Sequence, residues 1–446
     1  MNTPALLTPE VKRSGPAGLT ILRFAHAYDS GGGTERYLDD LDRALLDRSA
    51  ATVIRLHLTR ETSPGSETVE ALGLGQLIRL TLPVIASPGS ASPANGESPR
   101  FRLKQWARDR VLYNSVVWRA AGEKWTSSHR LSPRPGEAIG AGSAAAKILR
   151  SRRIDLVVMH FFGGSDADEI IAEARKCRVP VALINHYSND RFLHLANRKH
   201  VMLADGVAGV NGLDVPHYLK GRLQNVSDGI DTEFFRVEHA RPLANPPTRP
   251  IILLPARVVR EKGQMDLLGA AVSLRKAGLD FCIAFAGRVD ASDFVTELRR
   301  KIADTQMTEY VRFLDNLSVE ELRDWYAASA IVAFPTYHHE GLGRVSIEAQ
   351  AMNVPVVAYA TGGVPEGIIS GKTGYLVPTG DIAALTRHLG ELLASPGLRD
   401  SMARRGRGSV ETHFSLPAVA ERHERFYAQT ILAFQARISA RRQEAS

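Results

Sequence analysis

Short apolar runs alternate with amphipathic stretches along most of the chain, which indicates an α/β protein with parallel strands. The first run is residues 19–25 (LTILRFA), and the glycines at 31–33 follow it before an amphipathic helix expected from Thr34 to about Asp47. Further strands of the first half are expected at residues 51–58, 154–159, 179–184 and 207–210, with a helix at 166–177. Such alternation predicts a parallel sheet covered by helices.

A second series of strands and helices begins after a segment rich in Pro and Ala, residues 236–250 (RVEHARPLANPPTRP). Its strands are expected at residues 251–255, 281–286, 311–314, 330–334 and 355–359, and its helices at 263–277, 293–304, 318–328 and 346–352. Ser318 with Glu321 three residues later has the pattern of a capping box. A last helix from Leu416 to about Ala440 is followed by no strand.

These patterns predict two domains, each with its own sheet. We expect residues 1–18 to be disordered, 19–235 to form the first domain with an insertion at about 87–150, 236–415 to form the second, and 416–446 to be a long helix and tail. Open α/β sheets bind ligands at the carboxyl ends of their strands. A ligand site is therefore expected in a cleft between the two domains.

The composition is that of a soluble globular protein, with 44% hydrophobic and 23% charged residues among 446. The only two cysteines, Cys177 and Cys282, are too far apart for a zinc site and do not indicate a disulfide framework. The first 18 residues lack the apolar core of a signal peptide, and no apolar run reaches the roughly 18 residues that span a bilayer. We therefore expect a cytoplasmic protein.

The net charge of +8 is concentrated in one segment. Residues 100–153 hold 13 Lys and Arg against 3 Asp and Glu. Such a segment can attract anionic lipid, nucleic acid or an acidic substrate, or it can be a solvated helical insertion. Apolar residues such as Phe101, Trp106 and Val116 recur there at near-helical spacing. Two alternatives follow, a helix on an anionic membrane surface and a helix packed on its own domain; the second is slightly favoured.

The strongest chemical signal is the segment 334–366 (FPTYHHEGLGRVSIEAQAMNVPVVAYATGGVPE). Glu340 follows a strand, Gly341 and Gly343 flank Leu342, and a helix that contains Glu348 comes next. Glycines allow close approach of the backbone to a phosphate, and a helix start offers free N–H groups. Glu340 could bind sugar hydroxyls and Glu348 ribose hydroxyls, although acids near a helix start also simply favour the helix dipole.

Two cations, Arg257 and Lys262, follow the first strand of the second domain. Fixed cations there could neutralise a diphosphate and the charge that a departing nucleoside diphosphate gains. Surface salt bridges are the plainer interpretation. The glycine loop that includes Gly32 and Gly33 could also face a diphosphate. His186, at the end of a strand, is a candidate for contact with the substrate or for a structural role.

A metal site is not expected. Asp166 and Asp168 form one D-x-D pair and Asp40 and Asp42 another. The first pair is placed in the first turn of a helix, where acids are favoured, and the second lies within a helix. Arg257 and Lys262 can serve the phosphates instead.

Taken together, these motifs resemble those of glycosyltransferase family four, a retaining family with the GT-B fold. The resemblance rests on the E-x7-E pair Glu340 and Glu348, the EGLG loop, the R-x4-K pair Arg257 and Lys262, GGVPE at 362–366, GKTGYLVP from Gly371, and DGID at 228–231. It implies two Rossmann-like domains facing across a cleft, with the last helix crossing back to the first domain. It also implies a nucleotide diphosphate-sugar donor and no cofactor or metal.

The resemblance implies specific roles for residues of the second domain. Arg257 and Lys262 would contact the diphosphate, Glu340 the sugar, Glu348 the ribose, and the segment 313–316 would lie near the base. The catalytic candidates are Arg257, Lys262, Glu340 and His186. The donor-binding candidates are Gly32, Gly33, Gly287, Phe313, Leu314, Gly341, Leu342, Gly343 and Glu348. Transfer would retain the anomeric configuration through a same-face mechanism.

Two positions depart from the family pattern. Arg344 stands where an apolar residue is usual, and Asp228 where Asn is common. The predicted activity is transfer of a hexose to a glycan or lipid-linked acceptor in cell-envelope polysaccharide synthesis, with no nucleic-acid partner and with a peripheral membrane position as one alternative. A small soluble acceptor and an inactive nucleotide-sugar-binding module are the other hypotheses.

Overall fold

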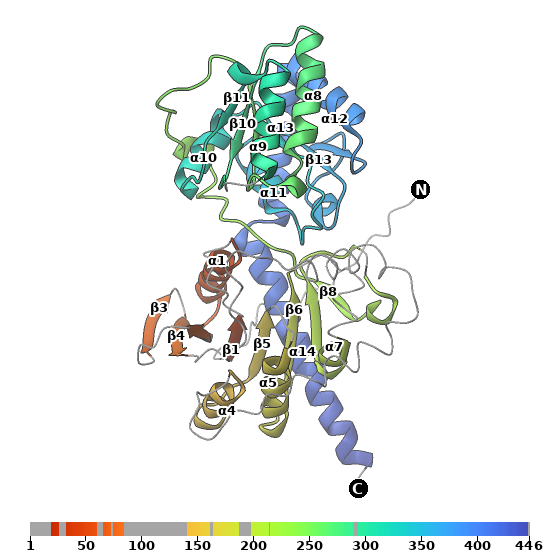
Figure 1. Cartoon of the computed structure of the whole chain (residues 1–446). Helices are drawn as coiled ribbons and strands as arrows, with labels where there is room; N and C mark the ends of the chain where they lie inside the picture. Colours follow the sequence, from red (N-terminus) through yellow and green to blue (C-terminus); the bar gives the residue numbers. More distant parts are fainter. Residues whose placement is uncertain are drawn as a thin grey trace.

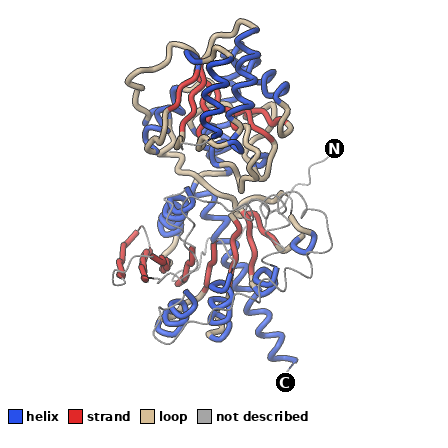
Figure 2. Tube along the Cα trace, in the orientation of Figure 1, coloured by secondary structure: helices blue, strands red, loops and turns tan. Residues whose placement is uncertain are grey.

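A computed structural model describes residues 19–25, 33–59, 66–72, 75–83, 141–160, 164–186, 198–213, 215–289 and 293–444. The chain folds into two α/β domains stacked one above the other (Figure 1). In each domain the strands lie in the middle and helices cover both sides of the sheet (Figure 2). The predicted organisation into two α/β domains is confirmed.

The amino-terminal domain contains an eight-stranded sheet with the strand order β3-β4-β2-β1-β5-β6-β7-β8. Neighbouring strands pair in parallel, except that β3 is antiparallel to β4. The strands are β1 (Thr20–Ala25), β2 (Thr52–Thr59), β3 (Ser66–Leu72), β4 (Gly75–Pro83), β5 (Leu156–His160), β6 (Val181–Asn185), β7 (Gly206–Gly209) and β8 (Leu223–Asn225).

Helices cover both faces of this sheet. One core contains side chains of α4 (Ala141–Ser151), α5 (Gly164–Lys176) and α7 (Arg198–Leu203). The other contains side chains of α1 (Gly33–Arg48) and of the last helix, α14 (Leu416–Glu444). Val419, Phe426 and Tyr427 of α14 are buried against Tyr37 and Leu41 of α1. The expected return of the last helix to the first domain is therefore confirmed, and Figure 1 shows α14 running along that domain.

Two features of the amino-terminal domain differ from the sequence-based expectation. The hairpin of β3 and β4 was not predicted, although β4 pairs with the whole of β2. The insertion expected at about 87–150 ends earlier, because α4 buries Ala145, Ile148 and Leu149 in the domain core. The rest of that insertion, residues 87–140, and the expected disordered segment 1–18 lie outside the described residues.

The carboxyl-terminal domain has a six-stranded parallel sheet with the order β11-β10-β9-β12-β13-β14. Its strands are β9 (Ile251–Pro255), β10 (Cys282–Ala286), β11 (Val311–Phe313), β12 (Ile331–Phe334), β13 (Val356–Tyr359) and β14 (Gly374–Val377). Its helices are α8 (Gln264–Lys276), α9 (Asp293–Asp304), α10 (Val319–Ala328), α11 (Arg344–Ala351), α12 (Ile382–Ala394) and α13 (Pro396–His413). Single 3₁₀ turns occur in both domains. Along the whole chain they are η1 (His217–Leu219), η2 (Val237–His239), η3 (Arg260–Lys262), η4 (Thr308–Tyr310) and η5 (Val364–Glu366).

Packing within this domain explains its element boundaries. Apolar side chains of α8, α9 and α12 cover one face of the sheet, those of α10 and α11 cover the other, and α13 contributes side chains to both cores. The capping box at the start of α10 is confirmed: Glu321 donates its backbone N–H to Ser318 Oγ, and its carboxylate accepts from the Ser318 N–H. Ile230 and Phe235 are buried in the core of this domain, so its packing begins earlier than the expected boundary at residue 236.

Candidate active site

Lys262 and Glu340 form an ion pair at the carboxyl edge of the second sheet. Lys262 ends η3 in the segment between β9 and α8, and Glu340 lies in the segment that follows β12, the neighbour of β9 in the sheet. The two side chains are 14% and 21% exposed, so water screens the pair only in part. Two of the predicted catalytic residues are thus brought together, with 77 residues between them in the sequence.

A tight turn holds Lys262 at this position. Gly263 has φ = 76°, and a Cβ there would lie 2.0 Å from the Pro335 carbonyl oxygen. The backbone N–H of Tyr337 donates to the Glu261 carbonyl over 2.8 Å. Because the left-handed region and the close approach both require glycine, Gly263 docks the η3 turn against the end of β12. The glycine that ends the sequence REKG therefore holds in place the turn that carries Lys262.

Arg257 lies two residues after β9 and is exposed, with no ion pair among the contacts found for the described residues. Gly287 follows β10, the other neighbour of β9, and its Cα approaches the backbone of Ala256 and Arg257. A Cβ at Gly287 would lie 2.4 Å from the Ala256 oxygen and 2.9 Å from the Arg257 nitrogen. Gly287 is therefore the residue that allows the strand ends to converge beside Arg257.

The loop Gly341–Gly343 connects Glu340 to the first turn of α11. Gly343 has φ = 76° and caps that helix. A Cβ at Gly341 would meet the carbonyl oxygen of His186, from the other domain, at 2.1 Å. This loop lies directly against the amino-terminal domain, which places the predicted donor loop at the contact between the two domains.

Glu348 lies one turn into α11, with both carboxylate oxygens contacted. Tyr326 donates its hydroxyl to Oε2 over 3.1 Å, and Arg344 Nε lies 3.5 Å from Oε1. Burial and then the Glu348 charge raise the pKa of Tyr326 well above its usual value, so the hydroxyl stays protonated and remains a donor. Tyr326 was missed by sequence reasoning, because a Tyr in an amphipathic helix looks like an ordinary core residue.

Arg344, whose side chain is 22% exposed, contacts groups on both sides of the domain boundary. Its Nη1 donates to the Gly229 carbonyl over 3.3 Å, and its guanidinium carbon lies 5.7 Å from the centre of the Tyr37 ring in the other domain. Arg344 therefore joins the helix that carries Glu348 to the domain boundary.

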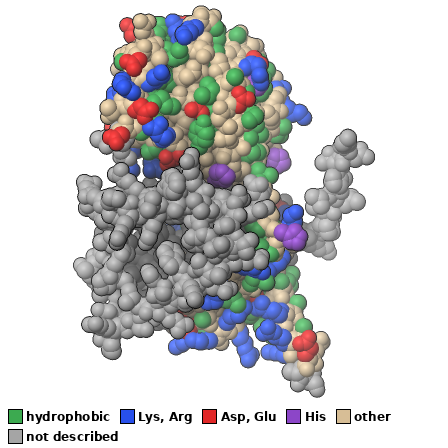
Figure 3. Space-filling model, turned by 45° about the vertical axis from the view of Figure 1, so that its right-hand side comes forward, with side chains coloured by type: hydrophobic (Ala, Val, Ile, Leu, Met, Phe, Trp, Pro, Cys, Tyr) green, Lys and Arg blue, Asp and Glu red, His purple; other side chains and the backbone are tan. Residues whose placement is uncertain are grey.

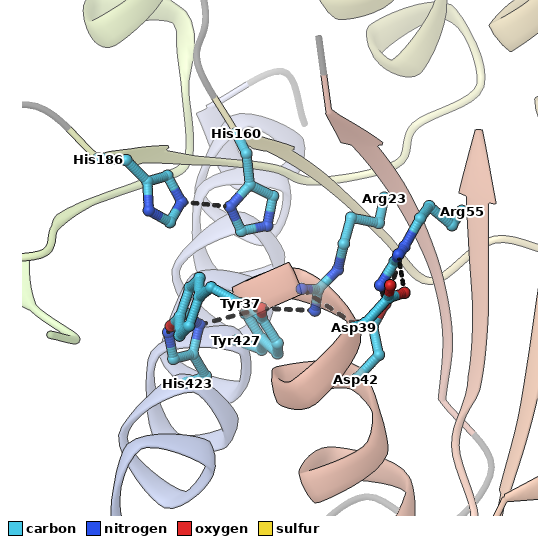
Figure 4. A network of polar contacts seen from close by, with 9 residues as sticks. All are labelled: Arg23, Tyr37, Asp39, Asp42, Arg55, His160, His186, His423 and Tyr427. Atoms are coloured by element: carbon cyan, nitrogen blue, oxygen red, sulfur yellow. Dashed lines mark hydrogen bonds and ion pairs between the residues drawn. The ribbon is translucent and has the colours of Figure 1, made fainter. Parts of the chain in front are cut away.

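His186 is buried just after β6, and both ring nitrogens are hydrogen-bonded within the protein. Nδ1 lies 3.2 Å from Asp228 Oδ1 and Nε2 lies 2.7 Å from His160 Nδ1. Because a carboxylate accepts, His186 donates from Nδ1 and its Nε2 accepts from the His160 N–H. Figure 4 shows the two imidazoles side by side above the buried polar cluster. Asp228 and His160 therefore occupy both ring nitrogens of His186 in this structure. The position of His186 at the end of a strand did not indicate either partner.

The polar cluster in Figure 4 lies between β1, β2, α1 and α14. Arg23 and Asp42 are both fully buried, with Nη1 and Oδ1 3.1 Å apart, and Arg55 pairs with Asp42 and Asp39. Tyr427 accepts from Arg23 Nη2 over 3.1 Å. Asp42, one member of a D-x-D pair, therefore serves a structural ion pair.

The remaining predicted site residues have separate positions. Gly32 lies outside the described residues, and Gly33 begins α1. Phe313 packs its ring against Phe285 and under Arg299, and Leu314 follows it at the end of β11. Asp168 pairs with Lys199 and His200. In the part of the chain that the structure describes, no three His, Cys, Asp or Glu side chains form a group that could hold a metal ion.

The buried histidines His160 and His423 lead us to expect that the stability of the protein depends on pH. Burial, followed by the charge of Arg23, lowers the pKa of His160 and of His423 well below the usual value. The unfolded chain therefore binds more protons than the folded chain below about pH 6.5. The free energy of unfolding should fall with decreasing pH below that value, by up to about 1.4 kcal/mol per pH unit for each histidine.

Urea unfolding between pH 7.5 and 5.5 measures this slope. His423→Gln should reduce the slope, because one of the two groups is removed. His413→Gln, which changes an exposed histidine, should leave it unchanged. An equal slope in the wild type and His423→Gln would contradict the assignment.

Comparison with known proteins shows what this chain is similar to. Residues 235–409 match the sequence model of the family described as glycosyl transferases group 1. One relative is a GDP-mannose-dependent alpha-(1-6)-phosphatidylinositol monomannoside mannosyltransferase of Mycolicibacterium smegmatis. The two sequences are 33% identical over 196 residues, and this alignment covers 42% of this chain and 50% of that protein. This chain is also 29% identical over 179 residues to the capsular polysaccharide biosynthesis glycosyltransferase CapM of Staphylococcus aureus, covering 38% of this chain and 44% of that protein.

Solved structures support the fold over nearly the whole chain. A glycosyltransferase from Rickettsia africae superposes with a TM-score of 0.66 at 17% identity, covering 93% of this chain and 99% of that one. Sucrose-phosphate synthase from Thermosynechococcus elongatus gives a TM-score of 0.64 at 19% identity, with 93% and 100% covered. The chain spans about half the length of the curated relatives it matches.

The fold and the family match agree with the resemblance seen in the sequence. The chain has the GT-B fold, as predicted, and its residues 235–409 match the family described as glycosyl transferases group 1. The matched residues include Arg257, Lys262, Glu340 and Glu348, four of the residues on which the resemblance in the sequence rested.

Proposed function

We propose that the protein transfers a hexose from a nucleotide diphosphate-sugar to a glycan or lipid-linked acceptor in cell-envelope polysaccharide synthesis. The observation that carries this proposal is the pairing of Lys262 with Glu340 beside the Gly341–Gly343 loop, in the domain that matches the family. The relatives support the reaction class, since their names describe a mannosyltransferase and a capsular polysaccharide glycosyltransferase.

The donor would bind mainly to the carboxyl-terminal domain. Lys262 and Arg257 would hold the diphosphate, Glu340 the sugar and Glu348 the ribose. As the sugar–phosphate bond breaks, the leaving diphosphate gains negative charge, and fixed cations stabilise that charge more than they stabilise the ground state. We expect transfer with retention of configuration through a same-face mechanism, in which the leaving phosphate takes the acceptor proton.

We expect the reaction not to require a metal ion, because Lys262 and Arg257 supply positive charge to the phosphates. Activity should therefore persist in EDTA. A loss of transfer in EDTA that is restored by Mg²⁺ or Mn²⁺ would show that this part of the proposal is wrong.

A thermal-shift screen of UDP-, GDP- and ADP-sugars tests the donor site. A ligand at 100 times its Kd stabilises the native state by about 2.7 kcal/mol. For a domain of this size that corresponds to a rise in Tm of about 5–10 °C. The shift should be lost in Lys262→Ala, and NMR of the product formed with the stabilising donor then gives the anomeric configuration.

The acceptor is the part of the proposal with two candidates. Relatives named D-inositol 3-phosphate glycosyltransferase, with 37% identity over 107 residues, favour a small soluble acceptor as the second candidate. Transfer assays with the chosen donor, offering a lipid-linked glycan and inositol phosphate in parallel, separate the two. Absence of both transfer and donor hydrolysis despite donor binding would favour an inactive sugar-nucleotide-binding module.

We also propose a cytoplasmic, peripheral position at an anionic membrane. In the described part of the chain no helix is long and apolar enough to span a bilayer. Figure 3 shows several Lys and Arg side chains at the lower end of the amino-terminal domain and mixed charges on the other domain.

The segment 100–124 lies outside the described residues. Flotation with anionic liposomes, comparing the intact chain with one lacking residues 100–124, tests its role; equal failure of both to bind would reject it.

A further inference from the structure

The carboxyl ends of the two sheets meet through two adjacent strands in each domain. Asn211 and Gly212 follow β7, and Asn225 ends β8, its parallel neighbour. On the other side, Gly341 follows β12, and Glu366 follows β13, again its parallel neighbour. Parallel neighbours end at the same edge of a sheet, so each domain presents a pair of loops to the other.

Glu366 accepts two hydrogen bonds from the opposite domain. Its Oε1 accepts from the Gly212 N–H, and its Oε2 accepts from Asn225 Nδ2 over 2.7 Å. Beside them, Asn211 Nδ2 donates to the Gly341 carbonyl over 2.6 Å. We call Glu366, Asn211, Gly212 and Asn225 the interdomain clasp.

The two asparagine amides are oriented by their own loops. Asn211 Oδ1 accepts from the Leu213 N–H over 3.1 Å, and Asn225 Oδ1 accepts from the Ser227 N–H over 3.0 Å. Because each side-chain oxygen is already an acceptor within its own domain, each NH₂ group points across the boundary. The donors of the clasp are therefore set before the domains meet.

On the other side, the GGVPE segment is packed as one unit with the donor loop. Gly363 donates its N–H to the Glu340 carbonyl over 2.8 Å, and a Cβ at Gly363 would lie 1.7 Å from the Gly341 oxygen. Gly362, with φ = 52°, would place a Cβ 2.5 Å from the Glu340 oxygen. Because of these close contacts, we expect a movement of Glu366 to shift Glu340 and Gly341 as well.

We infer that Glu366 is a positioning residue, which holds the donor loop in place by clasping the two domains together when they are closed. Opening the domains breaks both hydrogen bonds to Glu366 and frees the Gly341 carbonyl at the same time. The position of Glu340 is thereby coupled to closure. The inference rests on the proposed function for its catalytic meaning, but the clasp itself can be measured without any sugar substrate.

Hydrogen–deuterium exchange by mass spectrometry tests the clasp on the full chain. Without nucleotide, Glu366→Ala should speed exchange in the donor loop, residues 337–344, about tenfold, as expected for loss of about 1.4 kcal/mol. Asn225→Ala removes only one of the two hydrogen bonds to Glu366 and should speed exchange there less. The double variant should exchange no faster than Glu366→Ala, because that variant already removes the contact with Asn225 as well as the contact with Gly212. Glu366→Gln, which keeps one acceptor oxygen, should lie between Glu366→Ala and the wild type.

The matched control is Glu309→Ala, an exposed carboxylate in η4, which precedes β11 and so lies at the amino edge of the same sheet. It should exchange like the wild type. Exchange in β9 and α8 should be unchanged in every variant, which verifies that the domain stays folded. If acceleration is confined to residues 206–213 and 223–227, Glu366 is only a local cap for those amides and the inference is overturned; no acceleration overturns it as well.

The proposed function is tested by a separate experiment. In a transfer assay Glu366→Ala should lower kcat/KM for the donor about tenfold, with partial rescue by Glu366→Gln. If the exchange results hold and no sugar is transferred by the wild type, the clasp stands and the proposed function does not. If the wild type transfers sugar and the donor loop of Glu366→Ala exchanges normally, the reverse is true.

Discussion

Lys262→Ala should lower kcat/KM for sugar transfer by about 10²- to 10³-fold, the loss typical when one fixed charge-stabilising group is removed from an active site. The effect has two sources. In the proposed mechanism the cation beside the leaving diphosphate is lost, and Glu340 also loses its ion-pair partner. Steady-state kinetics with the donor found by thermal shift measures the change.

The fold should tolerate this substitution, since the side chain lies at the edge of the sheet and outside the hydrophobic cores. Lys276→Ala is the matched control: it changes an exposed lysine in the last turn of α8 and should keep full activity. Retention of more than a tenth of wild-type activity by Lys262→Ala would show that the diphosphate is held by other groups.

Asp42→Ala should lower the free energy of unfolding of the amino-terminal domain by about 3–5 kcal/mol, because it leaves the buried charge of Arg23 without its partner. Urea unfolding followed by circular dichroism measures the loss. Asp39→Ala is a close control: Asp39 lies one helical turn away and also pairs with Arg55, but its side chain is 43% exposed. It should cost about 1 kcal/mol or less. Equal losses in the two variants would mean that the Arg23–Asp42 pair contributes no more than a surface contact.

The sequence was sufficient for the parts of the fold that have strong local signals. Buried runs such as IILLP at 251–255 coincide with a strand of the structure, and the Ser318 cap lies where its spacing predicts. The edge hairpin of residues 66–83 was missed, because its strands have mixed composition and are stabilised by pairing with β2 rather than by local pattern. The end of the insertion was misplaced because the basic segment 100–153 was treated as one unit, although α4 within it buries Ala145, Ile148 and Leu149 in the domain core.

The arrangement of the candidate site was predictable where one segment carries its residues. Glu340, the glycine loop and Glu348 lie within nine residues, and the R-x4-K spacing finds the partner of Glu340. Long-range contacts were beyond reach. Nothing local in the sequence connects Glu366 with Asn225, 141 residues earlier, or Tyr326 with Glu348. Such pairs depend on which strands become neighbours, and a single sequence gives no direct signal of that.

The position of α14 in the amino-terminal domain has a consequence for how the chain is made. Residues 19–225 are synthesised first, yet Val419, Phe426 and Tyr427, which fill one face of their core, are added only after the entire second domain. Until then Tyr37 and Leu41 lack the helix that covers them, and the buried Arg23 lacks its Tyr427 contact. Domains generally fold as they emerge from the ribosome, but here the first domain to be synthesised is the last to be completed. The nascent chain therefore exposes an apolar face during the whole time that the second domain takes to appear.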